Sequence, residues 1–322
     1  NSGTEACELA VKMARKYWYD KGAPDRTEII TFSGSFHGRS SAGIAAAGSE
    51  KMTKGFGPLL PGFTHLEFGD HDALRAAVSD KIAAIMVEPI QGEGGIRPLP
   101  DVCLKGLRDL CDEHGILLIL DEVQCGMGRT GKLFAHEWSG ISPDIMMVAK
   151  GIGGGFPLGA VLATEKAASG MTTGTHGSTY GGNPLACAVG AKVMEIVGDD
   201  AFLAEVNRKA ALMRQKLEGL VAAHPTIFEA VRGSGLMLGL KCKATNSDVV
   251  KAGFEQGVLS VPAADNVVRL LPALNIPDDD IAQAIAFLCD SSKSGFINGV
   301  SLPVDGGWTA DGSWQSMRLK QR

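Results

Sequence analysis

Short apolar runs recur along the first half of the chain, and each is followed by a glycine-rich or polar segment. The runs are apolar throughout instead of alternating with polar residues, which is typical of strands buried on both faces of a parallel sheet. Segments of helical period separate them, such as residues 104–114. We therefore expect an α/β fold with a mainly parallel sheet and helices on both faces. The expected strands are residues 28–32, 82–87, 116–120 and 145–149.

The pattern changes after Pro184 to a long helical region, residues 185–224, in which Gly198 followed by two aspartates predicts a break. A smaller α/β part follows, and its last helix, residues 278–288, has an apolar face that includes Ile281. Beyond this helix the sequence is rich in Ser, Gly and Trp and has no helical period. Strands of the smaller part are expected at residues 227–231, 236–242 and 267–271.

These changes divide the chain into three parts. We expect a large domain at residues 1–198, a small C-terminal domain at 199–288 and a tail at 289–322. The chain opens on Asn1, not Met, and residues 1–4 already have the composition of a functional loop. We therefore expect that the chain starts within the large domain, whose N-terminal part is missing.

Polar side chains follow the predicted strands of the large domain. Ligands of parallel α/β sheets bind beyond the carboxyl ends of the strands, where these side chains gather. The sequence therefore predicts one crevice, lined by Phe36, Glu88, Asp121 and Lys150.

Composition excludes several classes of function. The 31 basic and 36 acidic residues give a net charge of −5 without a basic block, which argues against nucleic acid as a partner. No apolar run reaches the roughly 18–20 residues of a membrane helix. The seven cysteines include no C-x-x-C motif, so we expect reduced thiols in a cytoplasmic protein and no zinc site. Glycine, at 42 of 322 residues, is well above the usual frequency of about 7% and indicates many tight turns or close ligand approaches.

Two crevice residues have both a chemical and an ordinary interpretation. Lys150 precedes a glycine-rich segment and is either a solvated lysine at a strand end or an amine that forms a Schiff base with an aldehyde cofactor. Asp121 is either a helix cap or a buried carboxylate that faces a protonated ring nitrogen. No metal-binding pattern accompanies it, so a metal ion is not expected.

Each of the other candidate residues also has two interpretations when it is considered alone. Ser2 and Glu5 have the spacing of a capping box, and the free N–H groups of that helix end suit either an ordinary cap or a phosphate. Arg39 and Arg269 are candidates for binding carboxylates, with surface salt bridges as the alternative. His37 is interpreted as a structural histidine that hydrogen-bonds, in preference to a catalytic base.

Taken together and in this order, these signals resemble the class III pyridoxal-phosphate-dependent aminotransferases, most closely members that act on acetylornithine. The resemblance covers residues 1 to about 288 and implies the fold of aspartate aminotransferase, known as PLP fold type I. Cys7 and Cys125 depart from the family pattern without removing a catalytic group. The matching stretches are residues 1–6, 35–40, 87–95, 120–131, 149–159, 174–188 and 266–276.

The resemblance implies pyridoxal 5′-phosphate as the cofactor. Lys150 would hold it covalently and move the substrate proton, and Asp121 would keep the ring nitrogen protonated. Phe36 would stack on the ring. The remaining cofactor contacts would come from Gly3, Thr4, Val123, Gln124 and, from a neighbouring subunit of a homodimer, Thr179.

The resemblance also implies the substrates, N-acetylornithine and the pair glutamate and 2-oxoglutarate, in a step of arginine biosynthesis. Arg39 would bind a substrate carboxylate, and Ser178 would contact the acylated amino acid. Glu93 would mask Arg269 until glutamate arrives. The alternatives within the fold use ornithine, succinylornithine, succinyl-diaminopimelate or 4-aminobutyrate.

The tail has a different resemblance. Residues 290–310 are similar to the C-terminus of short-chain dehydrogenases but carry no nucleotide loop and no catalytic tetrad. An NAD(P)-dependent oxidoreductase fragment and an inactive fragment are therefore the alternatives from other classes. We expect the tail to reflect a fusion or assembly artefact and this chain to fold weakly or aggregate.

Overall fold

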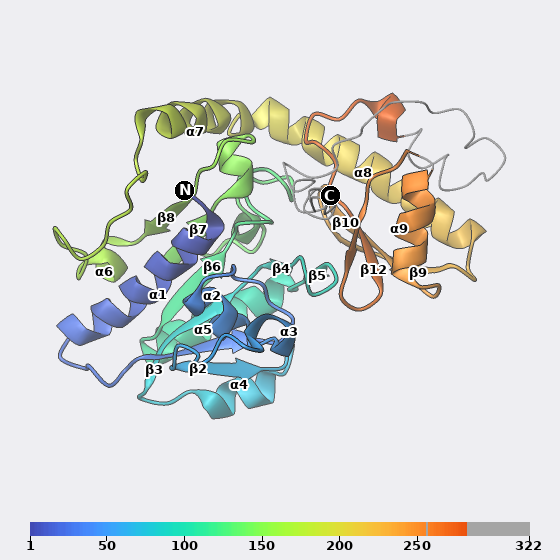
Figure 1. Cartoon of the computed structure of the whole chain (residues 1–322). Coiled ribbons are helices and arrows are strands. Elements are labelled where there is room, and N and C mark those ends of the chain that lie inside the picture. The colour runs from blue at the N-terminus through green and yellow to red at the C-terminus, as the bar shows by residue number, and fades with distance from the viewer. Residues whose placement is uncertain (256, 282–322) are drawn as a thin grey trace, which may run out of the picture.

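The computed structural model describes residues 1–255 and 257–281, which form a larger and a smaller β-sheet, a two-stranded hairpin and their helices (Figure 1). The larger sheet has the order β2-β1-β3-β6-β7-β8, and all neighbours are parallel except β7 and β8. The expected mainly parallel sheet is confirmed, with one antiparallel edge strand that the sequence analysis did not anticipate. Its strands are β1 (Glu28–Phe32), β2 (Phe63–Leu66), β3 (Ile82–Val87), β6 (Leu117–Asp121), β7 (Ile145–Val148) and β8 (Ala160–Ala163).

Helices cover both faces of the larger sheet, as the unbroken apolar strands predicted. Successive strand residues point to opposite faces. Leu117 and Ile119 therefore pack against α1 (Gly3–Asp20) and α2 (Ser41–Ala47), whereas Leu118 and Leu120 pack on the other face. That other face is covered by α4 (His71–Ala77) and α5 (Asp101–His114), which contribute Leu74, Leu104, Leu107 and Leu110.

The smaller sheet is antiparallel, with the order β11-β12-β10-β9. The long helix α8 (Asp200–Ala223) packs on it through Val206, Ala210, Met213, Leu217 and Leu220. The helix before it, α7 (Pro184–Val197), ends at the break that Gly198 predicted. The other elements of this part are β9 (Phe228–Ser234), β10 (Met237–Cys242), α9 (Asn246–Glu255), β11 (Val261–Ala263) and β12 (Val267–Leu270).

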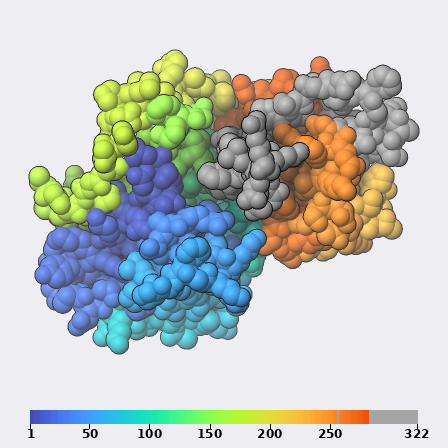
Figure 2. Space-filling model, in the orientation of Figure 1, coloured from blue at the N-terminus to red at the C-terminus, as the bar shows by residue number. Residues whose placement is uncertain are grey.

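The two sheets belong to adjoining lobes, coloured blue to green and orange in Figure 2. A short hairpin of the first lobe, β4 (Ile90–Gln91) and β5 (Arg97–Pro98), reaches the second lobe. There Ile96 and Ile90 share a buried apolar cluster with Met237 of the smaller sheet. The remaining short elements are α3 (Glu50–Thr53), α6 (Glu165–Ala168) and two 3₁₀ turns, Ala135–Trp138 and Lys150–Gly153.

Two elements differ from the bounds expected from the sequence or are described only in part. The strand expected to end at residue 120 extends to Asp121, because that residue still pairs with Met147 of β7. The helix expected at 278–288 begins at residue 278, and Ile281 is buried, but its remainder and the dehydrogenase-like tail lie outside the described residues. No helix of the described part is long and apolar enough to cross a membrane.

Candidate active site

A cavity of about 400 Å³ lies beyond the carboxyl ends of the parallel strands. Phe36, Glu88, Asp121 and Lys150 all line it, so the crevice expected from the sequence is confirmed. Its volume lies in the range of small-molecule sites. The cavity is therefore the candidate active site of this chain.

Asp121 is the last residue of β6 and is buried at the cavity wall. Its Oδ1 accepts the N–H of Val123 (3.0 Å), and its Oδ2 lies 2.8 Å from His37 Nδ1. Because a carboxylate only accepts, the imidazole donates this bond. Burial by itself would lower the pKa of His37, but the hydrogen bond and the charge of Asp121 outweigh it and raise that pKa. The pair is a buried carboxylate held in place by an imidazole.

Glu88 is a second buried carboxyl in the same wall. Its Oε2 accepts the N–H of Phe36 (3.0 Å), which fixes the backbone that carries the aromatic ring. Burial is the largest influence on this carboxyl and raises its pKa to about 8, with Asp121 contributing in the same direction. Glu88 therefore binds a proton near neutral pH.

Lys150 directly follows Ala149 at the end of β7 and begins the turn Lys150–Gly153. Its φ of +49° lies in the left-handed region, which a non-glycine residue adopts at an energetic cost and which is concentrated at functional sites. Burial lowers the pKa of its amine, against the opposing charges of Asp121, Glu88 and Glu93. The lowered pKa leaves more of this amine unprotonated near neutral pH than in a solvated lysine, so it is more available as a nucleophile and proton acceptor.

The N-terminus of α1 forms another part of the wall. Ser2 caps the helix, and its Oγ accepts the N–H of Glu5 (3.3 Å), as the capping-box spacing predicted. Gly3 and Thr4 line the cavity. A Cβ on Gly3 would lie 2.9 Å from Val123 Cγ1, so the helix end approaches this wall as closely as a glycine permits. Its free N–H groups and the helix dipole suit an anion, and a phosphate in particular.

Two arginines lie near the cavity, one in its wall and one behind the wall. Arg39 lines it, with its guanidinium carbon 5.4 Å from the centre of the Phe36 ring. Arg269 of β12 is only 5% exposed, and its Nη1 lies 2.6 Å from Glu93 Oε1 and 3.4 Å from Gln124 Oε1. Because Gln124 lines the cavity, the Glu93–Arg269 ion pair lies directly behind that wall.

Comparison with known proteins places this arrangement in a family. The class III aminotransferase family matches residues 1–291. The chain belongs to the class III aminotransferases. It is 72% identical over 294 residues to an acetylornithine aminotransferase of Rhodobacter capsulatus, covering 91% of this chain and 75% of that relative.

Solved structures agree with this assignment. The ornithine aminotransferase of Toxoplasma gondii ME49 is 34% identical with a TM-score of 0.85, covering 89% of this chain and 70% of that one. The N-acetylornithine aminotransferase of Stenotrophomonas maltophilia K279a is 38% identical with a TM-score of 0.76, covering 89% and 72%. The aminotransferase therefore has PLP fold type I, as expected from the sequence.

The cavity fits pyridoxal 5′-phosphate, the cofactor of class III aminotransferases. It brings together a lysine amine, a buried carboxylate and a helix N-terminus, the groups that an aldehyde, a basic ring nitrogen and a phosphate require. Within the described residues no cluster of metal ligands occurs, and all six cysteines are free.

Besides Glu93 and Arg269, two predicted site residues lie outside the cavity wall. Ser178 is exposed, and its Oγ lies 2.8 Å from Asn1 Nδ2 at the rim and 3.1 Å from Glu5 Oε1. Thr179 is exposed beside it and does not line the cavity of its own chain. Their roles toward substrate and phosphate stay predictions.

The structure also gives weight to residues to which the sequence analysis assigned no catalytic role. His37, interpreted from sequence as structural, contacts Asp121 directly, and its Nε2 is buried without a hydrogen-bond partner in the described part of the chain. Glu88 was expected to line the crevice but had no assigned contact. The sequence signal for Glu88 was its position directly after the predicted strand 82–87, and that for His37 was its position next to Phe36.

Proposed function

We propose that this aminotransferase transfers the δ-amino group of N-acetylornithine to 2-oxoglutarate, a step of arginine biosynthesis. The observation that carries the proposal is the 72% identity to the Rhodobacter capsulatus relative, which is named for this substrate. The ornithine aminotransferase structure has the higher TM-score but only 34% identity. A shared fold does not determine the substrate, because substrate choice depends on particular side chains.

Besides Lys150, six residues of this chain would hold the cofactor. Gly3 and Thr4 bind the phosphate at the N-terminus of α1, and Phe36 stacks on the ring. Asp121 would accept a hydrogen bond from the ring nitrogen and keep that nitrogen protonated, while Val123 and Gln124 would complete the wall. When bound, pyridoxal 5′-phosphate supplies an aldehyde that links to amino groups and a ring that accepts electrons from the substrate carbon.

Lys150 is the residue that moves protons. Its amine lies in the same cavity wall as Asp121, and its lowered pKa leaves a larger fraction unprotonated than in water. The Lys150 amine would take the proton from the substrate carbon, hold it and return it to complete the transfer. Asp121 acts at the other end of the ring, where His37 holds its carboxylate in place.

Two substrates with different arrangements must share the cavity. Acetylornithine presents its δ-amine and glutamate its α-amine, so an arginine that binds the α-carboxylate of glutamate hinders the first substrate. The ion pair with Glu93 (2.6 Å) occupies Arg269 until glutamate arrives. Arg39 binds a substrate carboxylate throughout, and Ser178 at the rim contacts the acyl group.

We further propose a homodimer in which Thr179 of the partner subunit reaches the phosphate. Support comes from the exposed segment around Thr179, where Tyr180 and Leu185 are 72% and 61% exposed. Large apolar side chains that are this exposed in one segment are consistent with a contact surface. Light scattering measures the mass, and a monomer with full activity would contradict the proposal.

The decisive experiment compares amino donors. Purified protein with pyridoxal 5′-phosphate and 2-oxoglutarate is given acetylornithine, ornithine, succinylornithine, succinyl-diaminopimelate or 4-aminobutyrate, and glutamate formation is measured. We expect the highest kcat/KM for acetylornithine. Lys150→Ala should abolish turnover, while Lys105→Ala on the exposed side of α5 is the matched control. A preference for ornithine would assign the alternative substrate.

A further inference from the structure

The loop that carries Glu93 lies across the smaller sheet and is held there by two arginines. Arg232 of β9, Gly239 of β10 and Arg269 of β12 are paired directly across neighbouring strands. Paired residues point to the same face of a sheet, so both arginine side chains leave that face together. Arg269 Nη1 donates to Glu93 Oε1 (2.6 Å), and Arg232 Nη1 donates to the carbonyl of Gly95 (3.4 Å).

Gly239 leaves room for the same loop between the two arginines. A Cβ on Gly239 would lie 3.0 Å from Ile96 Cγ1 and 2.7 Å from Val267 Cγ1. Ile96 is fully buried and has a φ of +49°. The loop is therefore packed against the sheet as well as hydrogen-bonded to it, and a displacement at one contact is transmitted to Glu93.

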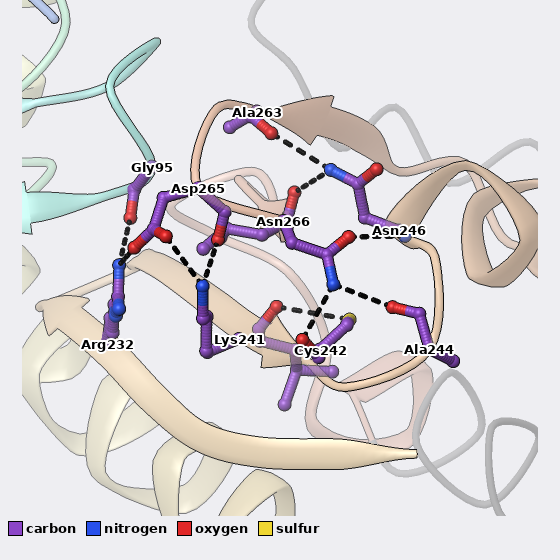
Figure 3. A network of polar contacts seen from close by, with 11 residues as sticks. Gly95, Arg232, Lys241, Cys242, Ala244, Asn246, Ala263, Asp265 and Asn266 are labelled. Carbon is purple, nitrogen blue, oxygen red and sulfur yellow. Dashed lines mark hydrogen bonds and ion pairs between the residues drawn. The ribbon is translucent and has the colours of Figure 1, made fainter.

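Asp265 connects the groups that hold this loop (Figure 3). Its Oδ2 lies 2.6 Å from Arg232 Nη1, and its Oδ1 lies 2.6 Å from Lys241 Nζ. The ammonium of Lys241 also donates to the carbonyl of Asp265 (2.6 Å). Hydrogen bonds from Lys241 and Arg232 lower the pKa of this carboxyl, so it is a carboxylate at neutral pH.

The turn that contains Asp265 also holds the main chain of Glu93. Asp265 and Asn266 have φ values of +53° and +52° and join β11 to β12, the strand of Arg269. The N–H of Ala264 donates to the carbonyl of Glu93 (3.0 Å). Glu93 is thus held at its carbonyl by the turn and at its carboxylate by the strand that follows the turn.

We propose that Asp265 is a positioning residue that adjusts the choice between the two amino donors by keeping Glu93 aligned with Arg269. The inference rests on the proposed function, in which Glu93 masks Arg269 for one donor and releases it for the other. Without the Asp265 carboxylate, Arg232 and Lys241 lose their common partner and the turn loosens its hold on the Glu93 carbonyl. Arg269 is then open to the α-carboxylate of glutamate for more of the time.

Asp265→Asn in the holoenzyme tests this, because asparagine has nearly the same shape and also tolerates positive φ. We expect the ratio of kcat/KM for acetylornithine to that for glutamate to fall about fivefold, the effect of weakening one charge-assisted contact. The change should come from the KM values, with kcat nearly constant. Hydrogen exchange should quicken at the Ala264 amide, a readout that does not depend on activity.

Three further variants make the result specific. Asp265→Asn in a Glu93→Gln background should add nothing to the ratio, because Asp265 acts through Glu93. Asp265→Glu keeps the negative charge and should restore part of the wild-type ratio. Asp278→Asn, at an exposed carboxylate 2.7 Å from Arg208, removes a comparable ion pair away from the loop and should leave the ratio unchanged.

Two outcomes would overturn the inference. One is an unchanged ratio in Asp265→Asn, and the other is an equal shift with and without Glu93. If Asp265→Asn does not fold, Lys241→Met removes the other partner of the carboxylate and should move the ratio in the same direction. A wild-type enzyme that does not use acetylornithine overturns the proposed function as well, whereas normal wild-type selectivity with an unaffected variant overturns only this inference.

Discussion

Replacing Glu88 with Gln measures the cost of a buried carboxyl in the active site. Glu88 is 4% exposed, and burial raises its pKa from an ordinary value of 4.5 to about 8. The unfolded chain loses this proton near pH 4.5, whereas the folded protein keeps it until about pH 8. Between these values the folded state binds more protons, so its stability falls as the pH rises. Above both pKa values the folded protein carries the whole free-energy cost of the buried, ionised carboxylate.

The magnitude follows from the same two pKa values. The interval between 4.5 and about 8, at about 1.4 kcal/mol for each pH unit, gives an upper bound of about 5 kcal/mol. Relaxation of the wall and water entry around the ionised carboxylate reduce this cost to about 2–3 kcal/mol. Glutamine keeps an oxygen that accepts the Phe36 N–H and has no ionisation to lose.

Urea unfolding of the cofactor-saturated protein at pH 5, 7 and 9 provides the assay. Relative to wild type, Glu88→Gln should gain about 2–3 kcal/mol of unfolding free energy between pH 5 and pH 9. Groups remote from Glu88 titrate equally in both proteins, so the difference reports Glu88 together with the charged groups that face it, His37, Asp121 and Lys150. Glu113→Gln, at an exposed position of α5, is the control and should follow wild type. Parallel pH profiles for Glu88→Gln and wild type would refute the reasoning.

Three other substitutions have defined outcomes. Glu93→Gln removes the charge that masks Arg269, and steady-state kinetics should show kcat/KM for glutamate rising about tenfold relative to acetylornithine; an unchanged ratio contradicts the masking role. His37→Asn keeps a donor to Asp121 but removes the positive charge, so the cofactor should dissociate about fivefold faster. The absorbance of the bound cofactor, followed after dilution, measures this rate, and a wild-type rate would argue for a purely structural histidine. Leu118→Ala in the fully buried β6 should cost about 2–5 kcal/mol in urea unfolding without changing the donor ratio.

Much of the active site could be predicted from the sequence because its residues occur after recognisable strands. Phe36, Asp121 and Lys150 each follow a buried apolar run, and the carboxyl ends of parallel strands meet at one edge of a sheet. The helix cap at Ser2 could also be predicted from sequence, because a capping box is a local interaction over four residues. Local signals of this kind survive folding with little change.

Contacts between segments that are far apart in the sequence were harder to predict. The bond between His37 and Asp121 joins residues 84 positions apart, and nothing near His37 in the sequence identifies its partner. The antiparallel strand β8 likewise depends on pairing with β7, since its four residues are only partly buried and give a weak pattern. Such features depend on which strands become neighbours.

The sequence by itself determined the buried strands, the helix starts and the residue types available for chemistry, because periodicity and capping act over a few residues. Tertiary structure decided how those groups influence one another. Burial beside Asp121 gives Glu88 its high pKa, and the contact between two lobes aligns Glu93 with Arg269. Both effects depend on distance and exclusion of water, which exist only once the chain has folded.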